Sequence, residues 1–301
     1  MFVKIKRVKS FEKGKVMAGE YLNIELCEKP NDIASNFADK AMPAKASNSF
    51  FKTLILAILA GAFIAFGAQG SLTAMAGTDS LSFGLAKLLG GIVFSTGLML
   101  IVFAGAELFT GNVLIGISVL EKKTTLLQLI RNWLIVYFGN FIGAVIVAYL
   151  IFSANAFHGA NEVLGVLSLK VAYGKVNLTF GQAFASGILC NWLVCMAVWL
   201  AAAAKDVAGK ILAILFPITT FAMCAYEHCV ANMFMITNGL FVKTSELVVN
   251  ASGLTPEQLS TLNLKSFLIT NLIPVTLGNI VGAFVFVVVL FWLVYLRNRS
   301  A

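Results

Sequence analysis

Six long apolar blocks dominate this sequence of 301 residues and restrict it to a membrane-embedded fold. A hydrocarbon core about 30 Å thick is crossed by about 20 helical residues, and every block is longer than that. Hydrophobic residues make up 59% of the chain and charged residues 12%, which excludes an ordinary soluble domain. The sequence therefore predicts an all-α membrane protein with six transmembrane helices. The blocks are residues 51–76, 88–120, 126–152, 180–204, 211–242 and 267–296.

The charged residues indicate how the spans are oriented. They lie mostly in residues 1–50 and in the gaps between blocks, and an even number of spans places both ends on one side. Most lysines and arginines fall in the tails and in the loops on that side, so the positive-inside rule predicts cytoplasmic termini in a cell (cytoplasmic) membrane. The net charge of +8 does not indicate a nucleic-acid partner, because no basic stretch is interleaved with stacking aromatic residues.

The chain divides into three predicted segments. Residues 1–50 form a cytoplasmic N-terminal segment that lacks the apolar core of a signal peptide and contains an amphipathic helix from Asn31 to Ser49. Met17 is an alternative translation start, and the sequence does not decide whether residues 1–16 belong to the native protein. Residues 51–296 form the six-helix transmembrane domain, and residues 297–301 form a cytoplasmic tail.

An internal repeat is the most informative pattern. The run N-W-L-I-V-Y-F-G-N-F-I-G-A from Asn132 resembles N-L-I-P-V-T-L-G-N-I-V-G-A from Asn271, and E-x-x-x-x-N occurs in both the second and the fifth block. Such weak symmetry is typical of duplicated transport folds. Two repeats, 51–152 and 180–296, each contain three helices, so the second must enter the membrane from the opposite face. The repeat is therefore predicted to be an aquaporin-like inverted 3+3 arrangement.

Blocks two and five are too long for one straight span. As a continuous helix, residues 88–120 would measure about 50 Å, so the chain must tilt steeply or break. Breaks in helices two and five are expected at the E-x-x-x-x-N segments, because Thr110-Gly111-Asn112 is poor helix-interior sequence. Non-helical backbone at membrane depth is tolerated only inside protein or along a watered cavity, so two symmetric breaks indicate a pore. The glycines of Gly139-x-x-x-Gly143 and Gly278-x-x-x-Gly282 are interpreted as packing residues alone.

Ionisable side chains deep in these blocks are costly and therefore candidates for function. Glu107 and Glu227, with Asn112 and Asn232 of the same motifs, are interpreted as structural polar residues: each glutamate is expected to accept hydrogen bonds from backbone N–H groups freed at a break, or to face a neighbouring subunit. His228 is different, because the corresponding position in the first repeat is Leu108. A lone buried histidine is more often a satisfied core residue, but its place at a predicted break favours a functional role.

Several of these motifs resemble the formate/nitrite transporter family. The resemblance rests on Ala104–Asn112, Asn132–Ala144, Leu189–Trp199 and Tyr226–Met233, and it covers about residues 30–296. It implies an aquaporin-like protomer of six helices, assembled in the membrane lipid as a homopentamer with one pore per protomer. It also implies a small monovalent anion as substrate, either formate, nitrite or hydrosulfide, between which the sequence does not choose.

The resemblance also assigns candidate residues. The loop of the broken second helix comprises Leu108, Phe109 and Thr110, and the hydrophobic constrictions comprise Phe94, Leu98 and Phe221. The central histidine is His228, with Asn191 and Thr110 as polar neighbours, and Lys175 is the basic residue of the outer vestibule. From these positions we expect an anion to be drawn in by Lys175 and to receive a hydrogen bond or a proton from His228, so that a weak acid passes the apolar constrictions. No catalytic residue, metal site or cofactor is expected.

Three alternatives remain open at this stage. A neutral-solute channel of aquaporin type fits the broken helices, but the twin Asn-Pro-Ala signatures are missing. An intramembrane enzyme is disfavoured, because the two histidines form no H-E-x-x-H motif and no nucleophile–base pair is evident. A proton-coupled secondary transporter is compatible with the same residues, and neither this choice nor the direction of transport follows from sequence.

Overall fold

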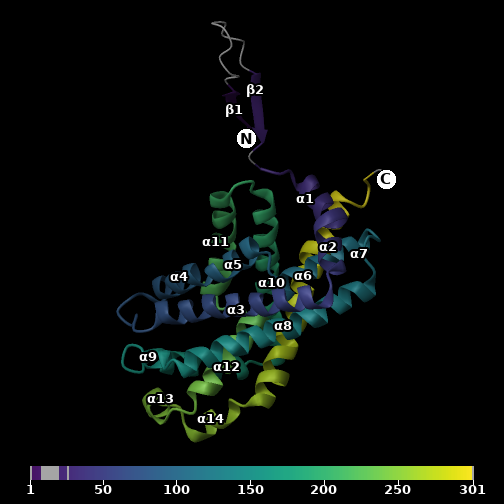
Figure 1. Cartoon of the computed structure of the whole chain (residues 1–301). Helices are drawn as coiled ribbons and strands as arrows, with labels where there is room; N and C mark the ends of the chain where they lie inside the picture. The colour runs from purple at the N-terminus through teal and green to yellow at the C-terminus, as the bar shows by residue number, and fades with distance from the viewer. Residues whose placement is uncertain (1, 8–19, 26, 300–301) are drawn as a thin grey trace.

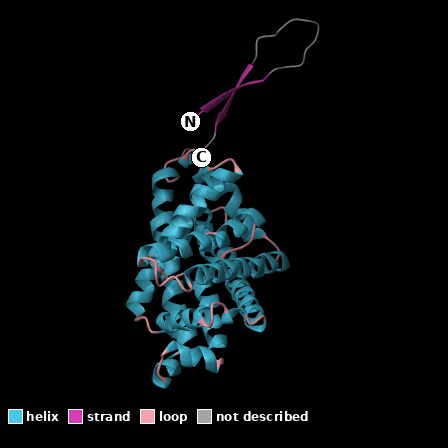
Figure 2. Ribbon diagram, turned by 90° about the vertical axis from the view of Figure 1, so that its left-hand side faces the viewer, coloured by secondary structure: helices cyan, strands magenta, loops and turns pink. Residues whose placement is uncertain are grey.

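The computed structural model describes all residues except 1, 8–19, 26 and 300–301, so the alternative start at Met17 lies outside the described residues. Near the N-terminus, β1 (Phe2–Arg7) pairs antiparallel with β2 (Glu20–Glu25), and Phe2 lies opposite Glu25. This hairpin projects away from a body that is helical (Figure 2).

A helical segment leads into the first long helix (Figure 1). It comprises α1 (Pro30–Asn36), the π-helical η1 (Phe37–Ala41) and α2 (Met42–Ser47), and α3 (Phe50–Met75) follows. Ile33, Phe37 and Met42 are buried, and the segment predicted as one amphipathic helix consists of three short helical pieces. The segment packs near the opposite end of the chain, because α1 contacts α16 (Leu290–Tyr295).

The remaining helices fall into two halves. The first half continues with α4 (Phe83–Phe94), α5 (Thr96–Ala104), α6 (Phe109–Asn112), the 3₁₀ turn η2 (Val113–Ile115), α7 (Gly116–Leu120) and α8 (Leu126–Ser153), followed by η3 (Ala156–His158). The second half comprises α9 (Val163–Val176), α10 (Phe180–Ala203), α11 (Val207–Met223), α12 (Cys229–Val242), α13 (Glu246–Ser252), α14 (Pro256–Thr261), the π-helical η4 (Ser266–Leu272), α15 (Ile273–Ala283), the π-helical η5 (Phe284–Val289) and α16.

Several of these helices are long and apolar enough to cross a membrane. Five stretches of the described chain meet both conditions: Phe50–Met75, Phe83–Ala104, Leu126–Ser153, Phe180–Ala203 and Ser266–Tyr295. The apolar block 211–242 is instead divided between α11 and α12, which are shorter. The chain is therefore a multi-pass membrane protein with one apolar block distributed over two short helices.

Two helix interruptions lie at equivalent places in the halves. In the first, α5 ends at Ala104, Gly105 has φ 67°, and α6 begins at Phe109. In the second, α11 ends at Met223, Ala225 has φ 55°, and α12 begins at Cys229. A left-handed residue ends a helix because it turns the chain out of the helical path.

The first interruption overlaps the predicted E-x-x-x-x-N segment, because Glu107 lies within residues 105–108, which separate α5 from α6. The stretch of low helix propensity that motivated the prediction, Thr110-Gly111-Asn112, forms most of α6. Thr110 and Asn112 are buried and hydrogen-bonded, and these tertiary contacts outweigh a weak intrinsic preference.

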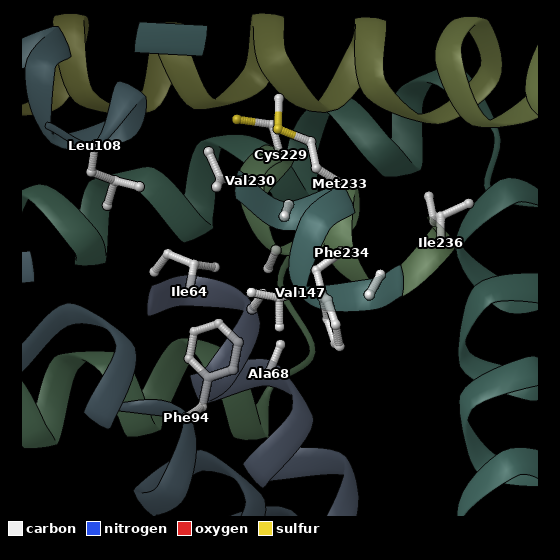
Figure 3. Close-up of a cluster of buried hydrophobic side chains, with 14 of the residues drawn as sticks. Ile64, Ala68, Phe94, Leu108, Val147, Cys229, Val230, Met233, Phe234 and Ile236 are labelled. Carbon is white, nitrogen blue, oxygen red and sulfur yellow. The ribbon is translucent and has the colours of Figure 1, made fainter. Parts of the chain in front are cut away.

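Close packing of helices stabilises each half internally. A Cβ atom added at Gly143 of α8 would collide with the carbonyl oxygen of Ile58 in α3, and one added at Gly282 of α15 would collide with that of Ile188 in α10. The packing role predicted for these glycines is therefore confirmed. Between the halves, buried side chains of α3, α4, α8 and α12 form a shared core that includes Ile64, Phe94, Val147 and Phe234 (Figure 3).

Candidate functional site

His228 lies at the second interruption and caps the helix that follows. Its Nδ1 accepts a hydrogen bond from the backbone N–H of Ala231 at 3.0 Å, so this nitrogen carries no proton. Its Nε2 lies 2.8 Å from the hydroxyl oxygen of Thr110, which belongs to α6 of the other half. The ring is therefore a neutral imidazole whose Nε2–H donates to Thr110. The side chain is 2% exposed.

Apolar side chains surround this ring. The rings of Phe94 and Phe221 meet edge to face with centroids 5.3 Å apart, and the Phe221 ring lies 6.0 Å from the imidazole. Leu98 and Leu108 are equally buried. All four side chains were singled out from the sequence, and all four belong to one buried apolar core, in which Phe94 and Phe221 are in ring contact.

These four side chains line two cavities. The first, called here the His228 cavity, measures about 80 Å³ and is lined by Phe94, Phe221 and His228 together with Lys87, Lys175 and Asn232. The second, called here the Leu108 cavity, measures about 250 Å³ and is lined by Leu98 and Leu108 together with Lys45, Lys210 and Asn112. Phe94 and Phe221 line one cavity, the two leucines line the other, and each cavity contains lysine.

A buried carboxylate network supports the first interruption. Glu107 is 2% exposed, and its Oε1 accepts a hydrogen bond from Lys45 Nζ at 3.0 Å. Its Oε2 accepts from the side-chain amide of Asn112 at 2.6 Å, and the same amide donates to Asn132 Oδ1 at 2.9 Å. The charge of the glutamate is therefore compensated by one ammonium group, and its second oxygen is satisfied by an amide donor.

The second interruption has the same network with equivalent residues. Glu227 Oε1 accepts from Lys175 Nζ at 2.7 Å, and its Oε2 accepts from Asn232 at 2.6 Å. Asn232 also donates to Asn271 Oδ1 at 2.8 Å. The two E-x-x-x-x-N motifs thus form matching ion-pair clusters, which we call the Glu107 cluster (Lys45, Glu107, Asn112, Asn132) and the Glu227 cluster (Lys175, Glu227, Asn232, Asn271).

The backbone donors freed at each interruption have amide partners. Asn140 Oδ1 accepts from the N–H of Phe109, and Asn279 Oδ1 accepts from the N–H of Cys229, both at 2.9 Å. Each asparagine also donates to two carbonyl groups, those of Ala57 and Glu107 for Asn140, and those of Gly187 and Glu227 for Asn279. Each asparagine therefore satisfies the first backbone N–H of the helix that follows the break.

These contacts change two interpretations drawn from the sequence. The carboxylates of Glu107 and Glu227 were expected to bind the freed backbone N–H groups, but the asparagines do so and the glutamates bind lysine instead. Lys175, expected to be the basic residue of the outer vestibule, forms an ion pair with Glu227. Lys45 was missed. A usable signal existed, since Lys45 and Lys175 each lie four residues before the capping residue of a long helix, Ser49 or Thr179.

Two other candidate residues make no direct bond to the His228 ring. Asn191 donates to the carbonyl oxygens of Thr110 at 3.2 Å and Asn279 at 2.7 Å, so it holds the Thr110 backbone and makes no direct bond to His228. The ring of Phe109 packs edge-on against Trp133 and Tyr137 of α8, and Phe109 is not among the lining residues of either cavity. Among the described residues, no group of three His, Cys, Asp or Glu side chains is placed to hold a metal ion.

Comparison with known proteins identifies the family. The family model described as "Formate/nitrite transporter" matches residues 31–293. The chain belongs to the formate/nitrite transporter family. The resemblance seen in the sequence motifs is thereby confirmed, and the family is one of channels and transporters.

Curated members and solved structures of the formate/nitrite transporter family are similar over most of the chain. The "Formate channel FocA" of Escherichia coli (strain K12) is 41% identical over 265 residues, which is 87% of this chain and 93% of that relative. The "Probable formate transporter" of Methanothermobacter thermautotrophicus is 40% identical over 292 residues, covering 88% and 100%. A solved "Pentameric formate channel with formate bound" superposes with a TM-score of 0.75 at 38% identity, covering 82% of this chain and 98% of that one.

Proposed function

We propose that this chain is the protomer of a homopentameric formate channel of a cell membrane, with both termini on the cytoplasmic side. The relatives named as formate channels and the solved pentamer with formate bound support the substrate and the assembly. The concentration of lysine and arginine in the tails and the loops on their side supports the orientation. Nitrite and hydrosulfide share the size and single charge of formate and are proposed as further permeants.

The proposed architecture is an inverted repeat of three plus three spans, with spans two and five interrupted. In this arrangement residues 51–152 and 180–296 are equivalent, and residues 1–50 and 297–301 lie on the cytoplasmic side. Its support is the matching of the Glu107 and Glu227 clusters, together with the equivalent bonds of Asn140 and Asn279. An odd number of spans per repeat inverts the second half relative to the first, so the two interruptions approach each other, and the contact between Thr110 and His228 joins them.

The proposed mechanism follows from the order of the groups along the path. Formate enters either cavity beside a lysine, where the positive charge offsets part of its desolvation cost. Phe94, Leu98, Leu108 and Phe221 then present a dry constriction that an anion crosses only at high cost. At this point the Nε2–H of His228 donates a hydrogen bond to the permeant, and Thr110 receives it between passages. Donation of a proton requires that the ring first take up a proton from the entering water or acid at Nδ1, which gives up its bond to the Ala231 N–H; the ring then gives a proton to the anion and returns to the neutral form. The observation that carries this proposal is the neutral, buried imidazole that lines the His228 cavity and contacts Thr110 of the other half.

Uptake into proteoliposomes tests the proposed function. Purified full-length protein is expected to admit formate faster than protein-free vesicles across about pH 5 to 8, the range in which an unperturbed imidazole titrates. Nitrite and hydrosulfide in the same assay rank the permeants, and vesicle swelling in glycerol or water tests the neutral-solute alternative. Swelling without formate uptake would refute the proposal, and single-channel recording separates a channel from a proton-coupled carrier.

The two histidines provide a matched pair of variants for the same assay. His228→Leu introduces the residue that the first half has at the equivalent position. The variant is expected to lower formate uptake at least tenfold and to flatten its pH dependence. His158→Leu is the control, because His158 lies in η3, is partly exposed and pairs with Glu162 at 2.6 Å, away from both cavities. If the His228 variant kept the wild-type pH profile, the proton-donating role would be excluded.

A further inference from the structure

The His228 cavity contains a hydroxyl group that the described residues leave without a partner. Ser71 of α3 is 4% exposed and lines this cavity, and its hydroxyl makes no hydrogen bond with any described residue. Its oxygen is not one of the unpaired, enclosed side-chain oxygens of the described chain, which belong to Gln69, Asn232 and Asn238. The Ser71 hydroxyl is therefore open to the cavity, and a molecule there that hydrogen-bonds to it would be stabilised.

A second group of the cavity is a cation without a counter-ion. Lys87 of α4 lines the cavity and is half-buried, and within the described part of the chain no carboxylate lies at ion-pair distance from its ammonium group. Its Nζ lies 5.7 Å from the centroid of the Phe83 ring. Because that ring is mostly exposed, the cation–π contact is worth only about 0.5–1 kcal/mol and leaves the charge available to an anion.

The two groups lie where neighbouring helices meet. A Cβ atom added at Gly90 of α4 would lie 3.0 Å from the hydroxyl oxygen of Ser71, so this oxygen faces α4. Gly90 follows Lys87 by three residues, which places both on the same face of that helix. Ser71 and Lys87 therefore approach the cavity from adjoining surfaces of α3 and α4.

The other polar groups of the cavity already have partners. Lys175 is ion-paired with Glu227, and both nitrogens of the His228 ring are hydrogen-bonded. The Tyr226 hydroxyl interacts with Cys224. Aspartate and glutamate are absent from the described residues that line the cavity. Lys87 thus gives the cavity a positive charge that the protein does not compensate.

These two free groups match the chemistry of a small monovalent anion. An ammonium group and a hydroxyl both donate hydrogen bonds, and an anion such as formate or nitrite has only acceptors. A hydrogen bond to a charged group contributes about 1.5–3 kcal/mol, more than one between neutral groups. The cavity of about 80 Å³ has room for several water-sized molecules, which is enough for such an anion and too little for a sugar acid such as gluconate.

We propose that Lys87 and Ser71 form a binding subsite for a small monovalent anion in the His228 cavity. Lys87 supplies the charge that retains the anion, because the charge of Lys175 is already compensated by Glu227. Ser71 supplies a directional hydrogen bond. The proposal rests on the proposed function and adds two specificity-determining residues to it.

Thermal unfolding of the purified full-length protein measures the binding without transport. A ligand of the folded state raises the unfolding midpoint, so formate or nitrite at tenfold excess over its dissociation constant is expected to raise it by about 1–3 °C relative to gluconate at equal ionic strength. Neutral formamide is expected to cause no shift. Lys87→Gln should abolish the shift and still fold, because no carboxylate loses its cation. An unchanged shift in Lys87→Gln would overturn the subsite.

Formate uptake into proteoliposomes tests the same residues in transport. Lys87→Gln is expected to raise the apparent KM about five- to tenfold and Ser71→Ala about two- to fivefold, while Lys87→Arg retains most of the affinity. Lys265→Gln is the control, because it removes an exposed charge that lines neither cavity, and its KM should stay within about twofold.

The outcomes separate this proposal from the proposed function. Formate uptake with an unchanged KM in Lys87→Gln would overturn the subsite and leave the proposed function standing. A fall in maximal rate at constant KM would assign Lys87 a structural role and would also overturn it. Absence of formate uptake by the wild type would instead refute the proposed function.

Discussion

The Glu107 and Glu227 clusters have nearly the same geometry, but the residues beside them differ. Each cluster contains a lysine, a glutamate and two asparagines in the same order of contacts, and each interruption has an asparagine on its backbone. The position that carries the imidazole side chain, His228 in the second half, is occupied by Leu108 in the first half. The comparison indicates that the repeated residues stabilise the interrupted backbone in both halves, whereas the residue that begins each following helix turn differs between the halves.

The largest effect is expected at the repeated asparagines that bind the backbone. Asn140→Leu and Asn279→Leu should each destabilise the protein by about 3 kcal/mol or more, because one backbone N–H and two carbonyl groups lose their partner in the interior. Thermal unfolding of the purified protein measures the loss. Asn177→Ala, on the exposed end of α9, is the control. Losses of stability that differ strongly between the Asn140 and Asn279 variants would show that the two halves are not equivalent.

The next effect separates the two lysines. Replacing either one by methionine leaves a buried carboxylate without its cation, which is destabilising. Lys175→Met is expected to cost about 3 kcal/mol and Lys45→Met about 1–2 kcal/mol, because the Lys175 side chain is 13% exposed and that of Lys45 is 31% exposed and better solvated. Chemical unfolding monitored by tryptophan fluorescence gives both values. If Lys45→Met destabilised the protein more than Lys175→Met, the solvation of the lysines would not explain the difference in stability.

A smaller effect is expected at the contact between the halves. Thr110→Val removes the hydroxyl that receives the His228 Nε2–H, and it should slow formate uptake about fivefold, the equivalent of about 1 kcal/mol. Thr110→Ser keeps the hydroxyl and should retain most of the rate. Uptake at several pH values is the measurement. The same loss in both variants would attribute it to packing of the methyl group.

The smallest effect concerns the ends of the chain, where the halves are not equivalent. Arg299 donates to Asp39 at 2.7 and 2.9 Å and also pairs with Glu121, which joins the C-terminal end to η1 and to the turn before α8. Arg299→Gln should destabilise this contact by less than about 1 kcal/mol, because the groups are partly exposed. Limited proteolysis of the segment before α3 reports the change, and Arg297→Gln serves as the charge-matched control.

The same contact predicts a pH dependence. Hydrogen bonds from Arg299 hold the pKa of the Asp39 carboxyl below its ordinary value, so folding favours its ionised form. The stabilisation is complete above the ordinary aspartate pKa of about 4 and is lost as the pH falls through the lowered value. Proteolysis of the wild type should therefore accelerate only at more acidic pH than that, and in Arg299→Gln it should already be fast at neutral pH.

Sequence patterns predicted the elements that depend on local composition or repetition. The apolar blocks correspond to the long helices, and the repeated E-x-x-x-x-N motifs lie directly at the two interruptions. The ion pairs were not predictable in this way, since Lys45 and Glu107 are 62 residues apart and Lys45 lies in a segment that looked like a cytoplasmic tail. The exact start of the first interruption depends on Gly105, one of 25 glycines, and its φ of 67° is a feature of the folded backbone that the sequence does not reveal.

In both ion pairs the lysine precedes its glutamate along the chain, Lys45 before Glu107 and Lys175 before Glu227. Because a protein is synthesised from its N-terminus, the cation of each pair leaves the ribosome before the carboxylate does. A carboxylate that enters a bilayer alone costs about 2.5–3.5 kcal/mol on insertion scales. The order of residues therefore supplies a counter-ion to each acidic segment as it partitions from the translocon into lipid. The free-energy barrier to membrane insertion is lowered in the same way for both glutamates.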